Sequence, residues 1–152
     1  MAINLYPGIY EVVSTYNNNS YKSFIKVTSS IVGNDIVKIF QNGTQFYATF
    51  YDKDGKTLAN NTDVSFNING VFYTRQTNEN GTAKLTINLR PGNYTLTAIN
   101  PTNDEQRGFN VVVLPNIETK DLIKYYKNES QFVVKVLKEW LTILIKNRYY
   151  YN

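Results

Sequence analysis

Short segments in the middle of the chain alternate between apolar and polar residues. In the clearest of them, Ala83, Leu85, Ile87 and Leu89 alternate with polar side chains. Because successive side chains of a β-strand point to opposite faces of a sheet, this pattern predicts a strand with one buried face. The same reasoning predicts strands at 36–40, 45–51, 64–68, 71–77, 83–89, 94–98 and 109–113.

Turn signals separate these segments. Asn69-Gly70 is the strongest, because a type I′ hairpin turn needs two residues that tolerate positive φ. The other turn signals are Asn42-Gly43, Asp52-Lys53-Asp54-Gly55, Asn78-Glu79-Asn80-Gly81 and Pro91-Gly92. Seven short strands with one apolar face each, and no convincing helix, predict an all-β sandwich of two packed sheets.

Two stretches of sequence recur along the chain. Residues 3–10 (INLYPGIY) are similar to residues 87–94 (INLRPGNY), a spacing of 84. Residues 35–46 are similar to residues 121–132, a spacing of 86. Because the two pairs are collinear, we predict a repeat of roughly 85 residues. The predicted parts are the C-terminal strands of one repeat (1–28), a complete repeat (29–116), and the N-terminal strands of a third with an atypical end (117–152).

The half-repeats on both sides leave sheet edges open. We therefore predict that they pair with one another, within one chain or between chains. In the repeated Pro-Gly segment, Tyr94 and Tyr10 occupy equivalent positions. Each is a candidate tyrosine corner, in which the hydroxyl bonds back to nearby backbone; a simple core tyrosine is the alternative.

Three motifs, in their order along the chain, resemble a known class of repeats. The segments Phe46–Lys56 (FYATFYDKDGK), Asn78–Ala83 (NENGTA) and Leu89–Ala98 (LRPGNYTLTA) resemble bacterial-type immunoglobulin-like repeats. Such repeats occur in invasin- and intimin-like proteins and in adhesin-like surface proteins of methanogenic archaea. The resemblance covers residues 3–137. It implies an immunoglobulin-like fold, an extracellular location, neighbouring repeats as partners, and a spacer or display role in cell adhesion.

The composition removes most catalytic chemistry. The chain has neither His nor Cys, which excludes thiolate nucleophiles and every His-containing triad. The adjacent carboxylates Asp104 and Glu105 lie in a polar segment and should be solvated. The Asp52–Gly55 segment lacks the bidentate Glu that a calcium loop needs, so a plain turn is favoured. We expect no enzyme activity, no metal and no cofactor.

The charge distribution and the hydropathy limit the classes of partner that we expect for this chain. The net charge of +4 belongs to the ends, since residues 1–27 carry +1, residues 117–152 carry +3 and the segment between them is neutral. This distribution is not the focused basic face of a nucleic-acid binder. No apolar run reaches the roughly 18 residues of a membrane span, and the first residues lack the features of a signal peptide.

Three kinds of candidate site remain. Asn-X-Ser/Thr triplets, which are glycosylation acceptors in surface proteins, occur at Asn18, Asn42, Asn60, Asn80, Asn93 and Asn128. Exposed aromatic side chains at Tyr47, Tyr51 and Tyr73 could bind surface glycans or proteins, which makes a carbohydrate- or cell-wall-binding module the alternative function. Lys38 and Asn110 could form an isopeptide bond, although alternation places Asn110 outward. A fragment without independent function is a further alternative.

Overall fold

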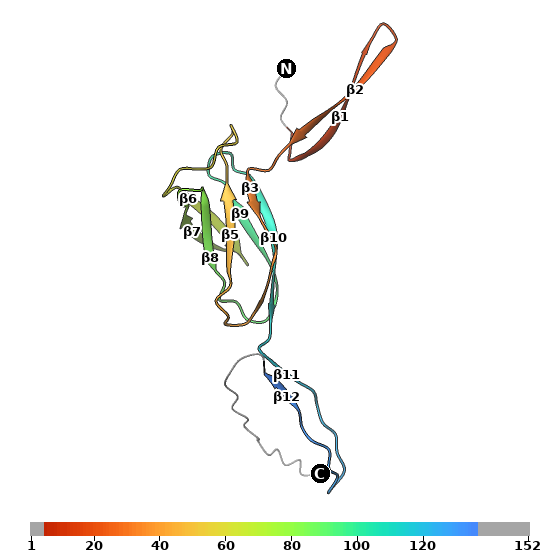
Figure 1. The fold of residues 1–152 in the computed structure, drawn as a ribbon, viewed down its shortest axis with the longest axis vertical. Helices are drawn as coiled ribbons and strands as arrows, with labels where there is room; N and C mark the ends of the chain where they lie inside the picture. The colour runs from red at the N-terminus through yellow and green to blue at the C-terminus, as the bar shows by residue number, and fades with distance from the viewer. Residues whose placement is uncertain (1–4, 137–152) are drawn as a thin grey trace.

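A computed structural model describes residues 5–136. The described residues form twelve strands and no helix, and the predicted all-β sandwich is present in the middle of the chain. A two-stranded ladder flanks the sandwich on each side, and the two ladders leave from opposite ends (Figure 1). In the part of the chain that is described, no helix is long and apolar enough to cross a membrane.

The sandwich consists of a three-stranded and a five-stranded sheet. The strand orders are β3-β5-β8 and β4-β10-β9-β6-β7. All neighbouring strands are antiparallel except β4 and β10, which are parallel. The strands are β3 (Ile31–Gly33), β4 (Ile36–Ile39), β5 (Gln45–Phe50), β6 (Asp63–Ile68), β7 (Val71–Gln76), β8 (Thr82–Thr86), β9 (Gly92–Ile99) and β10 (Gln106–Leu114).

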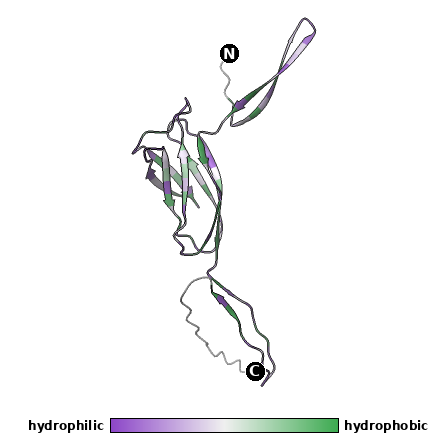
Figure 2. Ribbon diagram, viewed as in Figure 1, coloured by the Kyte–Doolittle hydropathy of each residue, from purple (hydrophilic) through white to green (hydrophobic). Residues whose placement is uncertain are grey.

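Aromatic rings from both sheets form the centre of the core. Phe46 of β5 contacts Phe66 of β6 edge-to-face, with ring centroids 5.8 Å apart, and Phe109 of β10 at 5.0 Å. All three side chains are buried. Figure 2 shows apolar and polar residues interspersed along the strands of the sandwich, as the sequence alternation predicts.

The predicted turns have the backbone geometry that their residues allow. Asn69 and Gly70 both have positive φ, at 52° and 79°, which fits the type I′ turn expected between β6 and β7. The Asp52 carboxylate accepts hydrogen bonds from the amides of Asp54 and Lys56, each at 2.9 Å. This carboxylate therefore stabilises a plain turn, and the described residues contain no cluster of three metal-ligating side chains.

The flanking ladders are simpler. β1 (Gly8–Tyr16) and β2 (Asn19–Val27) are joined by a two-residue turn, in which Asn17 and Asn18 both have positive φ. On the other side, β11 (Ile117–Thr119) pairs with β12 (Val134–Val136). The atypical end that the sequence predicts after Leu137 lies outside the described residues.

Candidate functional site

The N-terminal ladder has the same register as the β9–β10 ladder of the sandwich. Gly8 lies opposite Val27, and the counterparts Gly92 and Val113 also lie opposite one another. All eight pairs of the β9–β10 ladder have such a counterpart in the nine pairs of the hairpin, with a spacing of 84 in the first strand (8 to 92) and 86 in the second (27 to 113). The difference of two residues lies in the connection between the strands.

The same correspondence extends to a side-chain hydrogen bond. The Tyr94 hydroxyl donates to the carbonyl of Arg90 at 2.9 Å, and the Tyr10 hydroxyl donates to the carbonyl of Tyr6 at 2.8 Å. Both donors and both acceptors are related by the spacing of 84. Each tyrosine thus makes the bond that a tyrosine corner requires.

The C-terminal ladder has the register of the β3–β5 ladder. In the sandwich, Ile31 lies opposite Phe50; in the C-terminal ladder, Ile117 lies opposite Val136. All three pairs of the two ladders are related by a spacing of 86 in both strands.

Lys38 of β4 in the sandwich also has a counterpart near the C-terminal ladder. Lys38 is buried, and its Nζ donates to the carbonyl oxygens of Asn42, Thr44 and Ile87 at 2.7–3.1 Å. Burial lowers the pKa of this ammonium group, because desolvation disfavours the charged form. Lys124, at a spacing of 86, donates to the carbonyl of Ser130, which is the counterpart of Thr44, at 3.2 Å.

Core positions of the sandwich correspond to uncovered positions in the C-terminal half-repeat. Ile31 and Phe46 are 0% exposed, whereas their counterparts Ile117 and Phe132 are 46% and 52% exposed. Leu122, the counterpart of the half-buried Ile36, is exposed as well. Residues 117–136 thus expose side chains that correspond to the inner face of the sandwich.

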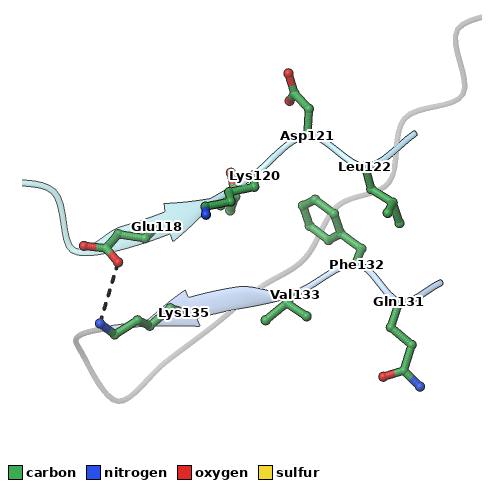
Figure 3. A pocket seen from close by; sticks show the side chains of 9 residues that line it. Glu118, Lys120, Asp121, Leu122, Gln131, Phe132, Val133 and Lys135 are labelled. Atoms are coloured by element: carbon green, nitrogen blue, oxygen red, sulfur yellow. Dashed lines mark ion pairs between the residues drawn. The ribbon is translucent and has the colours of Figure 1, made fainter. Parts of the chain in front are cut away.

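An open groove of about 620 Å³ lies along the C-terminal ladder, lined by Leu122 and Phe132 of this face and also by residues of the opposite face such as Val133. Figure 3 shows the Leu122 and Phe132 side chains next to one another in the groove, and the exposed Glu118–Lys135 ion pair, 3.7 Å long, joins its two strands. The lining residues come from the two strands and the segments that follow and precede them. The groove is therefore an open feature of the ladder rather than a pocket closed around a small molecule.

The N-terminal half-repeat has the matching inner face. Leu96, Val111 and Val113 are buried in the sandwich, and the residues at the equivalent positions of the hairpin are only half-buried. These residues are Val12, Ile25 and Val27. Two positions depart from the pattern, because Ser23 stands where the sandwich has Phe109 and Ser14 stands where it has Ala98.

A carboxylate fixes the linker between the N-terminal half-repeat and the sandwich. Glu105 accepts hydrogen bonds from the Ser29 hydroxyl at 2.6 Å, the Ser30 amide at 2.7 Å and the Ser30 hydroxyl at 2.6 Å. Burial raises the pKa of Glu105, but these hydrogen bonds and the nearby Arg107 charge outweigh it and hold the pKa below its usual value. The expectation that Glu105 is merely solvated is therefore wrong, because its partners lie 75 and 76 residues away in the sequence.

The three predicted binding tyrosines do not form one patch. Tyr47 is 55% exposed on the outer face of β5, while Tyr51 and Tyr73 are only half-buried rather than exposed. Tyr73 lies opposite Phe66 and packs against the core, so it faces inward from the other sheet. Phe72 is the exposed aromatic residue of β7. The continuous apolar run 71–73 gives no alternation from which to assign its inward face.

The predicted isopeptide pair is not brought together. Lys38 points into the sandwich and donates to three carbonyl groups, whereas Asn110 is exposed and its side chain donates to Asp35 at 2.9 Å. The outward position expected for Asn110 is observed.

The glycosylation triplets lie at the surface. Asn42 is half-buried, and its side-chain oxygen accepts the Thr44 amide; the remaining candidates are exposed. These are Asn18, Asn60, Asn80, Asn93 and Asn128. Asn128 differs from the other exposed candidates in that its side-chain oxygen accepts from the amide and hydroxyl of Ser130. Glycosylation of these six asparagines stays a prediction.

Comparison with known proteins gives no family. No protein-family model and no curated protein matches the chain. Among solved structures, it is similar to domains 4 and 5 of the S-layer protein SbsC, with 16% identity and a TM-score of 0.39, over 71% of this chain and 66% of that one. It is also similar to SGBP-B of the Bacteroides ovatus mixed-linkage glucan utilization locus, with 18% identity and a TM-score of 0.35, over 76% of this chain and 31% of that one.

Proposed function

We propose that the chain is a stretch of immunoglobulin-like tandem repeats from a cell-surface protein, and that it acts as a non-catalytic spacer and display element in adhesion. The observation that carries the proposal is the recurrence of two ladders in register. The β9–β10 ladder recurs as β1–β2, and the β3–β5 ladder recurs as β11–β12. Three consecutive copies of one sandwich account for this recurrence.

The path of the chain suits a stalk. The chain enters and leaves the sandwich at opposite ends (Figure 1). Only residues 28–30 separate β2 from β3, and only residues 115–116 separate β10 from β11. Repeats joined in this way contact mainly their neighbours and extend along one direction, which provides reach.

The strand pairing suits a load along the stalk. β4 follows β3, the first strand of the sandwich, and pairs in parallel over four residue pairs with the end of β10, which leads to the exit. Tension between the ends of the chain pulls these strands along their own axes in opposite directions. Their hydrogen bonds then resist together in shear instead of opening one after another.

Single-molecule force extension of the chain, held at its two ends, tests this proposal. We expect one cooperative unfolding event for the sandwich, with a gain in length of roughly 25–30 nm for residues 29–116 at about 3.4 Å per residue. A gradual extension at low force, with no discrete event, would contradict a load-bearing spacer. A glycan array with the wild type and Tyr47→Ala tests the carbohydrate-binding alternative, which now depends on Tyr47 alone among the three predicted tyrosines.

A further inference from the structure

We infer that the C-terminal half-repeat of one copy of this chain binds the N-terminal half-repeat of a second copy, head to tail, by pairing residues 122–125 in parallel with residues 25–28. This inference rests on the repeat relationship in the proposed function. Its template is the parallel β4–β10 ladder within the complete repeat.

The register follows from the ladder inside the sandwich. There, Ile36 lies opposite Val111, Val37 opposite Val112 and Lys38 opposite Val113. A spacing of 86 relates each of these six residues to a residue in one of the half-repeats. The expected pairs between copies are Ile25 with Leu122, Lys26 with Ile123, Val27 with Lys124 and Thr28 with Tyr125.

The two faces are complementary in chemistry as well as in register. Ile117, Leu122 and Phe132 are the counterparts of residues that, in the complete repeat, pack toward the β9–β10 ladder. In the N-terminal half-repeat, Val12 and Ile25 are the counterparts of the buried Leu96 and Val111. Joining the faces would remove these apolar side chains from water, which favours association.

Lys124 supports the same arrangement. Its bond to the Ser130 carbonyl corresponds to the Lys38–Thr44 bond of the sandwich. In the sandwich, Lys38 also donates to the carbonyl of Ile87, which lies before the Pro-Gly corner. The counterpart of Ile87 is Ile3, which belongs to the N-terminal half-repeat and lies outside the described residues.

The two half-repeats of one chain cannot meet. They extend from opposite ends of the sandwich (Figure 1), and linkers of two or three residues span at most about 7–11 Å. A second copy is therefore the occupant. The composite has no counterparts of β6, β7 and β8, and Ser23 replaces Phe109 in its core, so we expect the association to be reversible and weaker than folding of the complete repeat.

Cysteine cross-linking tests the register, since the chain has no cysteine of its own. Lys26→Cys and Ile123→Cys are prepared separately, mixed and oxidised gently. We expect the disulfide between the two variants to exceed the fraction that random pairing gives. Val133→Cys is the matched control, because Val133 is also exposed in the C-terminal half-repeat but is the counterpart of Tyr47 on the outer face of the other sheet. Its disulfide with Lys26→Cys should stay at the random level.

Light scattering over a range of concentrations tests the association itself. We expect the apparent mass to rise with concentration, Leu122→Asp to abolish the rise, and Ile123→Asp, at the neighbouring outward position that is 97% exposed, to leave it. A monomer at every concentration overturns the inference but leaves the proposed spacer function, which the force measurement tests. Association that Leu122→Asp leaves unchanged, or that gives no excess of the mixed disulfide, also overturns it.

Discussion

The complete repeat and the C-terminal half-repeat contain the same strand pair in two different surroundings. In the complete repeat the β3–β5 ladder covers a core, and Ile31 and Phe46 are fully buried. In the half-repeat the β11–β12 ladder has the same register, yet its apolar face is open. The comparison teaches that pairing of these strands requires only local sequence, whereas burial requires β6–β10 from elsewhere in the chain.

We expect the largest difference between the sandwich and the C-terminal ladder when equivalent phenylalanines, Phe46 and Phe132, are replaced by alanine. Phe46→Ala leaves a cavity among the rings of Phe66 and Phe109, so we expect a loss of about 3–5 kcal/mol in the free energy of unfolding. Phe132→Ala, at the equivalent exposed position, should change it by less than about 0.5 kcal/mol. Urea denaturation followed by circular dichroism measures both, and equal losses would contradict the assignment of Phe132 to an open face.

A glycine that precedes β8 should show the next largest effect. Gly81 has a φ of 66°, and a Cβ built on it would lie 2.8 Å from Thr57 Cβ and 2.9 Å from the Leu58 amide nitrogen. Gly81→Ala combines overpacking with left-handed strain, so we expect a loss of about 2–4 kcal/mol.

Gly55→Ala is the control for this substitution. Gly55 has a φ of 76° but no atom within 4 Å of the added Cβ, so only the backbone term of about 1–2 kcal/mol should remain. Thermal unfolding of both variants makes the comparison. Equal shifts in Tm would show that close packing before β8, an element with no counterpart in either half-repeat, does not limit the stability of the sandwich.

The two tyrosine corners should differ although their geometry is the same. Tyr94→Phe removes a hydrogen bond within the cooperative sandwich, and we expect a loss of about 0.5–1.5 kcal/mol. Tyr10→Phe removes the equivalent bond from the N-terminal hairpin, which makes no ladder with the sandwich, and should leave the unfolding free energy of the sandwich unchanged. Denaturant titration of each variant and of the wild type shows whether the N-terminal hairpin unfolds together with the sandwich or separately from it.

The linker carboxylate should give the smallest effect, and one that depends on pH. The pKa of Glu105 is lowered in the folded state, so its contribution is present above the unfolded value of about 4.5 and is lost as the pH falls through the folded pKa. Glu105→Gln should cost no more than about 1 kcal/mol at neutral pH, since the group is partly solvated. The difference from the wild type should shrink below about pH 4 in thermal unfolding, and a constant difference would assign the effect to packing.

Alternation predicted the strands of the sandwich well, but not every strand or contact. The seven predicted segments correspond to β4–β10 with small shifts at their ends. β3 was missed because three residues, Ile31–Gly33, are too short to show a period. The two packed sheets were predicted, but which strand belongs to which sheet was beyond the pattern, because a pair such as Ile36 and Val111 depends on contacts 75 residues apart.

The candidate sites followed from the sequence only in part. The repeated Pro-Gly-X-Tyr segment led to the hydrogen bonds of Tyr10 and Tyr94, since a tyrosine corner is a local motif. Tyr73 was placed wrongly because its inward direction is set by pairing with β6. The bonds from Glu105 to Ser29 and Ser30 depend on the folded sandwich and have no local signal.

The loop that carries Glu105 has a consequence for the flexibility of a whole stalk. In the complete repeat this loop runs between β9 and β10 and holds the incoming linker through Ser29 and Ser30. In the N-terminal hairpin the equivalent connection, residues 16–19, is two residues shorter than residues 100–105, and Asn19 stands at the position that corresponds to Glu105. A loop without this carboxylate cannot form the hydrogen bonds that hold Ser29 and Ser30, so we expect the stiffness of a joint between repeats to depend on this one loop while the strands stay the same.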